Sequence, residues 1–142
     1  EVIRELAPRT YTVHLKNWKV VRINDGILIR GCPLGDGIID IQSVVEILKR
    51  DTPHPDELHL NIEVAQEYIP LYIFTSEFWK YHKKVTGSEL GNILRLVEKH
   101  NADPTIDYRL ACMRGASETE VLAEEESAIQ KSVHYAQKIL RL

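Results

Sequence analysis

The sequence predicts a mixed α/β fold that contains parallel strands. Two short segments, residues 10–16 and 58–64, are rich in β-branched and aromatic or alternating apolar residues, which is typical of strands. The amphipathic segment 41–50 lies between them and has the spacing of a helix. A strand, a helix and a second strand in this order form a βαβ unit, whose strands pair in parallel through a right-handed crossover.

The composition favours a single globular domain and excludes several classes of protein. The chain has 142 residues, of which 44% are hydrophobic and 27% are charged, and its net charge is −3. We expect no binding to nucleic acid, because a basic excess is absent, and no membrane segment, because no apolar run approaches about 20 residues. Two distant cysteines and the lack of a signal peptide predict reduced thiols in a cytoplasmic protein.

The first predicted strand follows a helix end at residues 1–6, which the proline at position 8 terminates. Strand 10–16 has nearly continuous apolar positions, so we expect both of its faces to be covered, as in a parallel sheet. The chain begins with Glu1 rather than Met, and it begins inside a helix. We therefore expect further protein upstream of this residue.

A β-hairpin is expected directly after this strand. Residues 20–23 and 27–30 flank the turn Asn24-Asp25-Gly26, where Asp-Gly supplies the positive φ angles of a tight turn. The loop 31–37 contains three glycines, which permit close approach of the backbone to a ligand. Asp40 is then a plausible N-cap for helix 41–50.

The second half of the chain is expected to be mainly helical. In strand 58–64 the apolar residues alternate with His59, Asn61 and Glu63, so these three share one face. Residues 66–74 read as an irregular stretch around Pro70. Helices are predicted at 76–84, at 89–100 and at 117–142, where Ser117 begins a capping box. The inward residues expected in the last helix are Val121, Leu122, Ile129, Val133, Ala136, Ile139 and Leu140.

His14 and Glu63 are the strongest candidates for chemistry. Both lie near the ends of predicted parallel strands, which is where (β/α) barrels place their active sites. An inward carboxylate in such a place must be paired or must bind a cation. Two plainer interpretations stay open: His14 as a hydrogen-bonded structural histidine, and Glu63 as a partner of a nearby Lys or Arg. Cys32 is a weak candidate nucleophile, because the sequence identifies no base for it.

These pieces together resemble a known superfamily. His14-Leu15-Lys16-Asn17-Trp18, a hairpin, the loop from Gly31 to Asp40, a helix and Asn61-Ile62-Glu63 resemble the xylose isomerase-like barrels, the sugar phosphate isomerase/epimerase superfamily. Their usual pattern is a His-Leu-Lys-Asp strand end, a Leu-Gly-Glu-Gly loop that ends in Asp, and a final strand that closes on Glu. The resemblance covers about residues 8–65.

The resemblance implies a metal site and a class of reaction. It assigns His14 and Glu63 as ligands of a divalent metal ion (Mn, Mg, Co or Zn), Glu63 as the catalytic carboxylate, and Lys16 and Arg30 as substrate-binding residues. The metal would polarise a sugar carbonyl or stabilise an enediolate while a carboxylate moves a proton. The sequence departs from the pattern in two places: Asn17 stands where Asp is usual, and Cys32 stands where the endonuclease IV branch has a zinc-binding histidine.

The resemblance also implies that the chain is the C-terminal part of a (β/α)8 TIM barrel, which takes about 250 residues in full. Residues 7–65 would supply the last two barrel strands with the hairpin and the intervening helix, and residues 66–142 a C-terminal helical extension. The remaining strands would lie upstream. The function expected is a metal-dependent isomerase, epimerase or related lyase acting on a small sugar, sugar phosphate or sugar acid, in a homo-oligomer. The alternatives are a non-catalytic barrel remnant that serves as a binding or assembly module and an endonuclease IV-like enzyme.

Overall fold

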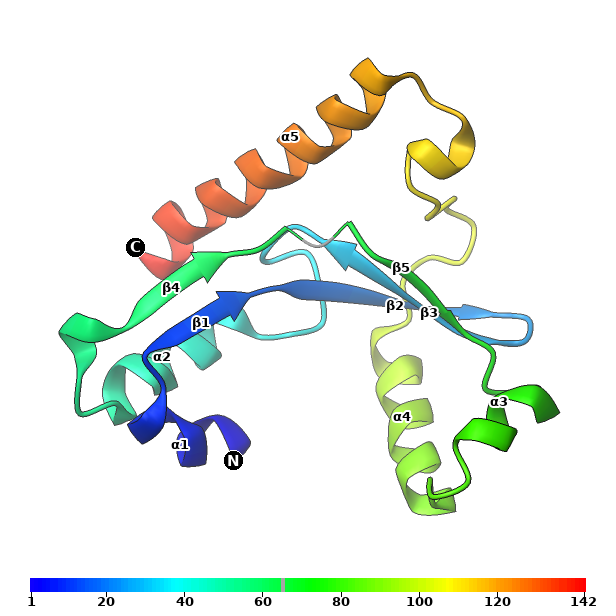
Figure 1. Cartoon of the computed structure of the whole chain (residues 1–142), viewed down its shortest axis with the longest axis horizontal. Helices are drawn as coiled ribbons and strands as arrows, with labels where there is room; N and C mark the ends of the chain where they lie inside the picture. The colour runs from blue at the N-terminus through cyan, green and yellow to red at the C-terminus, as the bar shows by residue number, and fades with distance from the viewer. Residues whose placement is uncertain (65) are drawn as a thin grey trace.

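The fold is mixed α/β, with two small sheets and no closed barrel in the part of the chain that the structure describes. The structure is a computed structural model that describes residues 1–64 and 66–142 (Figure 1). A two-stranded sheet has the order β1-β4, and a three-stranded sheet has the order β2-β3-β5. The boundary expected at residue 65 lies outside the described residues. No described helix is both long enough and apolar enough to cross a membrane.

The predicted βαβ unit is present. Strand β1 (Thr12–Leu15) pairs in parallel with β4 (His59–Ile62), and α2 (Ile41–Asp51) lies between them in the chain. The register aligns His14 with Asn61 and Leu15 with Ile62. The side chain of Asp40 accepts a hydrogen bond from the backbone N–H of Ser43, which confirms the predicted N-cap of α2.

Only one face of the β1-β4 sheet is covered, so the expectation of two covered faces was wrong. Leu15 is 2% exposed and packs in a core cluster with residues of α2 and of the C-terminal helix. His14 and Asn61 lie on the other face and are exposed. Since successive side chains of a strand point to opposite faces, the covered face takes the apolar residues and the open face keeps the polar ones.

The hairpin is longer than predicted and gains a third strand. Strand β2 (Asn17–Ile23) pairs antiparallel with β3 (Gly26–Cys32), which pairs antiparallel with β5 (Tyr68–Leu71). Residues 66–74, which were expected to be irregular, therefore contain a strand, β5. Pro70 is tolerated there because β5 is an edge strand, where a missing N–H breaks no second ladder.

The turn of the hairpin also differs from the prediction. Ile23 pairs directly with Gly26, so Asn24 and Asp25 form the two-residue turn, and neither has a positive φ. Gly26, which closes the turn, has a positive φ of 158°, a backbone conformation that other residues rarely adopt. A Cβ atom there would also lie 2.0 Å from the carbonyl oxygen of Leu71, so glycine permits the close approach of β5 as well.

The helices confirm most of the predicted boundaries. Short α1 (Val2–Leu6) and α3 (Ser76–Tyr81) accompany two longer helices, α4 (Gly87–His100) and α5 (Glu118–Tyr135). Both longer helices begin with a capping box, at Thr86 and at Ser117. Single turns of 3-10 helix occupy Ala7–Arg9, Pro55–Glu57 and Cys112–Arg114, and α5 runs on into a π-helical turn, Ala136–Leu140.

The inward face predicted for the last helix is only partly right. Ala136 and Leu140 are buried, and so is Ser132, whose hydroxyl accepts a hydrogen bond from the backbone N–H of Leu34. Four predicted inward residues are exposed instead: Leu122, Ile129, Val133 and Ile139. The helix touches the rest of the protein mainly through its C-terminal end and leaves an apolar face open.

Asn17 joins the two sheets. It begins β2 immediately after the end of β1, and it is 1% exposed. Its side-chain Oδ1 accepts from the backbone N–H groups of Trp18 and Ile39, and its Nδ2 donates to the carbonyl oxygen of Ile39. The position therefore requires a side chain that both donates and accepts hydrogen bonds, which an asparagine amide does and an ionised aspartate does not.

We predict that Asn17→Asp destabilises the protein by at least about 2 kcal/mol, because it removes the donor to Ile39 and buries a carboxylate against a carbonyl oxygen. Burial raises the pKa of the new carboxyl in the folded state, so the lost stability should return as the pH falls and worsen as it rises. Urea denaturation at pH 4 and pH 7 measures this. Asn24→Asp in the exposed turn is the matched control, and an equal effect in both variants would contradict the role of Asn17.

Candidate functional site

The parallel pairing of β1 with β4 brings His14 and Glu63 together. His14 lies in β1, and Glu63 directly follows β4 and donates its backbone N–H to the carbonyl oxygen of Leu15. The distance from His14 Nδ1 to Glu63 Oε2 is 2.8 Å. The two residues are 49 positions apart in the sequence, so only the βαβ topology places them in contact.

Lys16 completes a three-residue contact. Its Nζ lies 2.5 Å from Glu63 Oε1, so each carboxylate oxygen of Glu63 has one partner. The hydrogen bond from Lys16, followed by that from His14, lowers the pKa of Glu63 below its ordinary value. The hydrogen bond to Glu63 raises the pKa of Lys16 in turn. Glu63 is thus a carboxylate and Lys16 an ammonium group at neutral pH.

Glu67 extends this arrangement into a polar cluster, defined as His14, Lys16, Glu63 and Glu67. Glu67 Oε1 lies 3.6 Å from Lys16 Nζ, and Oε2 accepts a hydrogen bond of 2.7 Å from Trp18 Nε1. The cluster is open to solvent: the side chain of His14 is 62% exposed and that of Glu63 is 41% exposed. Its charged groups therefore remain accessible to a small polar ligand.

The metal-binding potential of the cluster rests on two donor residues. The structure describes no group of three or more His, Cys, Asp or Glu side chains, within residues 1–64 and 66–142, that could hold a metal ion. His14 and Glu63 are two side chains of these types in contact. Both plainer interpretations from the sequence also hold geometrically, since His14 is hydrogen-bonded and Glu63 is paired with a lysine.

Arg30 does not join the polar cluster. It pairs across the ladder with Lys19 and Tyr68, on the face of the three-stranded sheet opposite to Trp18. Its guanidinium donates to Glu124 Oε1 at 2.9 Å and to the carbonyl oxygen of Tyr108 at 3.0 Å. The side chain is 13% exposed, so Arg30 ties α5 and the segment before it to the sheet. Its expected contact with the substrate of His14 and Glu63 has no support in this geometry.

The glycine loop serves packing. A Cβ atom at Gly35 would lie 2.4 Å from the ring of Tyr135, and one at Gly37 would lie 2.2 Å from Asn17 Oδ1. Gly35 and Gly37 therefore permit close contact with other parts of the protein, whereas the sequence had suggested close contact with a ligand. Cys32 at the start of the loop is buried, and burial raises the pKa of its thiol to about 11. A protonated thiol is a poor nucleophile.

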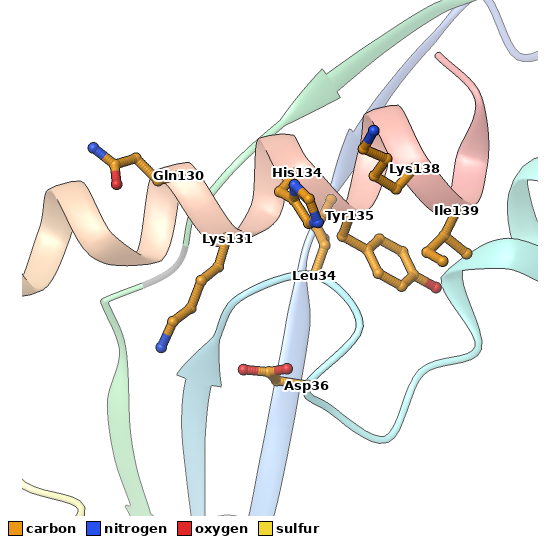
Figure 2. A pocket seen from close by; sticks show the side chains of 8 residues that line it. All are labelled: Leu34, Asp36, Gln130, Lys131, His134, Tyr135, Lys138 and Ile139. Atoms are coloured by element: carbon orange, nitrogen blue, oxygen red, sulfur yellow. The ribbon is translucent and has the colours of Figure 1, made fainter.

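One surface depression lies away from the polar cluster. It is a groove of about 710 Å³ between the loop after β3 and the C-terminal end of α5, where Lys131, His134 and Lys138 project from the helix (Figure 2). Asp36 lines the opposite side. None of the residues predicted to act in catalysis or binding lines this groove, so it adds nothing to the site at His14 and Glu63.

Comparison with known proteins adds no assignment. No protein-family model matches the chain, and no curated protein or solved structure is significantly similar to it. The arguments about function therefore rest on the residues and their geometry.

Sequence reasoning missed Glu67 and gave no separate role to Trp18. A signal for Trp18 was present in the strand periodicity, because Lys16 and Trp18 are two residues apart and share a face. Glu67 carried no such signal, because it precedes β5 in a stretch that was expected to be irregular. The backbone N–H of Gly31 donates to the carbonyl oxygen of Glu67, and this bond holds the residue beside β3.

We predict that the carboxyl of Glu63 titrates below its ordinary pKa in the native protein and returns toward it in Lys16→Met, which removes the largest cause of the shift. Because this pKa is lowered, the stabilisation should be present above the pKa of the unfolded chain and lost as the pH falls through that of the folded protein. NMR titration of the side-chain carboxyl carbon measures both. Lys80→Met, in α3, is the control. An unchanged Glu63 titration in Lys16→Met would refute the contact.

We predict that one thiol per native chain reacts rapidly with an aromatic disulfide reagent at neutral pH, and two after denaturation. Cys112 is exposed, whereas Cys32 is buried and its pKa is raised to about 11. Cys112→Ser should abolish the fast phase, and Cys32→Ser should leave it intact. A fast phase that persists in Cys112→Ser would mean that Cys32 is an accessible thiolate.

Proposed function

We propose that the protein is a metal-dependent isomerase or epimerase, or a related lyase, that acts on a small sugar, sugar phosphate or sugar acid. The observation that carries the proposal is the contact between His14 and Glu63 at the carboxyl ends of two parallel strands. This is the edge of a parallel sheet at which active sites form. The resemblance of the motifs to the xylose isomerase-like superfamily supplies the reaction class.

The two side chains fit one half of a metal coordination sphere. Two ligands of one ion, each at about 2.1 Å and at a right angle, stand about 3 Å apart. The observed separation of His14 Nδ1 and Glu63 Oε2 is 2.8 Å. An imidazole with a carboxylate suits Mn²⁺, Mg²⁺, Co²⁺ or Zn²⁺ without selecting among them. Water or substrate oxygens would supply further ligands, as in open catalytic sites.

The chemistry is a proton transfer next to a carbonyl group. A bound divalent ion would polarise the carbonyl oxygen and stabilise the negative charge of an enediolate. For isomerisation, Glu63 Oε1 would accept the proton from the carbon beside that carbonyl and return it to the neighbouring carbon, while the hydroxyl proton passes from one substrate oxygen to the other. For epimerisation, a second acid would have to donate a proton to the opposite face of the same carbon. Lys16, held as an ammonium group by its raised pKa, would donate a hydrogen bond to a substrate oxygen.

The proposal includes the cellular location of the protein and its association with other chains. A cytoplasmic location accords with the two free cysteines. The exposed apolar residues of α5 accord with association of the chain with itself or with another part of a longer protein.

One alternative draws on a specific observation. Because the described residues offer no group of three metal-binding side chains, the chain also fits a non-catalytic remnant that serves as a binding or assembly module. Such a module would fold and associate without metal. An endonuclease IV-like activity has less support, because the net charge is −3 and Cys32 replaces a zinc-binding histidine. Incubation with a duplex that contains an abasic site would test that activity.

We predict that the purified chain binds one Mn²⁺ or Zn²⁺ per molecule, measured by isothermal titration calorimetry. His14→Ala and Glu63→Ala should each weaken binding by about 100-fold or more, because loss of a supporting residue alone costs about 10–100-fold. Stoichiometric binding would justify a screen of sugars and sugar acids for isomerase activity.

The matched control is His59→Ala, which removes an exposed histidine from the same face of β4. This variant should bind metal like the wild type. Equal losses in His14→Ala and His59→Ala would mean adventitious binding by surface histidines. No binding by the wild-type chain would reject the metal site in this chain and favour the non-catalytic module.

A further inference from the structure

An apolar groove adjoins the polar cluster. Its floor is the face of the three-stranded sheet that carries Trp18, Ile29 and Ile69, and one wall is formed by Ile93 and Leu96 of α4. Ile38 and Ile39 from the loop before α2 also line it. The cavity volume is about 460 Å³, which lies within the range of about 300–1,000 Å³ that is typical of small-molecule sites.

The groove has one polar end. Glu67 is the only charged residue that lines it, and Glu67 is also the member of the polar cluster that reaches Lys16. Trp18 marks the boundary, because its indole N–H is bonded to Glu67 while its ring lies in the groove. The ring is therefore free to pack against apolar groups or against the C–H face of a sugar.

The shape of the groove disfavours a second copy of the chain as its occupant. A standard protein interface takes about 20–30 residues from each side. Only three of the large hydrophobic residues that line the groove are strongly exposed, namely Ile69, Ile93 and Leu96. The other lining residues form a concavity between the sheet and α4. A small apolar group fits such a concavity, whereas a flat protein surface reaches only its rim.

We propose that the groove binds the apolar part of an amphiphilic ligand whose polyhydroxylated, sugar-like head lies at the polar cluster. The apolar lining demands a hydrocarbon or aromatic group. The carboxylates of Glu63 and Glu67 accept hydrogen bonds from hydroxyl groups, and Lys16 donates one. This inference rests on the proposed function and narrows its substrate class, from small free sugars to sugars or sugar acids that bear an apolar substituent.

Alkyl glucosides of increasing chain length test this inference. Below their micelle concentrations, hexyl, heptyl and octyl glucoside should bind with an affinity that rises about fourfold for each methylene that enters the groove. Calorimetry with EDTA present makes this measurement independent of any metal. Octanol, which lacks the sugar head, should bind more weakly than octyl glucoside, and the difference should shrink in Glu67→Ala.

Leu96→Asp should abolish the dependence on chain length, because it places a carboxylate on the wall of the groove. Ile93→Lys is a second variant at another exposed position of α4, so the result does not depend on one substitution. Leu122→Asp, an equivalent change on the exposed face of α5 outside the groove, is the matched control and should bind like the wild type. Circular dichroism establishes that each variant is folded.

Three results of the binding measurements would overturn the inference. These are affinity that does not change with chain length, a length dependence that survives in Leu96→Asp, and equal affinity for octanol and octyl glucoside. Dimerisation that Leu96→Asp abolishes would identify a second copy as the occupant and would overturn it as well. Metal binding without any length dependence would overturn the inference and leave the proposed function in place. A length dependence without metal binding would overturn the metal chemistry and support the groove.

Discussion

The parallel pairing of β1 with β4 is the constraint on which the candidate site depends. Two residues 49 positions apart meet because a right-handed βαβ crossover aligns the carboxyl ends of their strands. The register of the pairing determines which side chains share a face. Leu15 and Ile62 point into the core beneath the sheet, and His14 and Glu63 lie on the open face. The energetic basis of the site is therefore apolar burial on the opposite face of the same strands.

A short chain of hydrogen bonds and ion pairs links the site to the second sheet. From His14 it passes through Glu63, Lys16 and Glu67 to Trp18, which is already a residue of β2. The buried amide of Asn17 fixes where β2 begins, and so the angle at which Trp18 meets the polar cluster. Lys16 has two roles that compete. It keeps Glu63 ionised, and it also occupies an oxygen that a metal ion or a substrate would use.

Much of this arrangement was predictable, and the failures have physical causes. Strand patterns and helix capping, which are local signals, predicted the βαβ unit, and the contact of His14 with Glu63 follows from the parallel pairing within that unit. The third strand was missed because Pro70 normally argues against a strand, and only its edge position makes it acceptable. The contact of Arg30 with Glu124 was not predicted, because the face of the sheet on which Arg30 lies depends on the hairpin register. The asparagine at position 17 was interpreted as the loss of a carboxylate, whereas its Nδ2 donates a hydrogen bond to the carbonyl oxygen of Ile39 that an aspartate carboxylate could not donate.

The central claim is that His14 and Glu63 act together as ligands of one metal ion. The most direct test is a crystal structure of the protein grown with Mn²⁺, with an anomalous difference map calculated at a wavelength where manganese scatters strongly. The account predicts a single peak within about 2.3 Å of a ring nitrogen of His14 and of a carboxylate oxygen of Glu63. An ordered His14–Glu63 hydrogen bond with no peak beside it, or a peak on other side chains, would contradict the account.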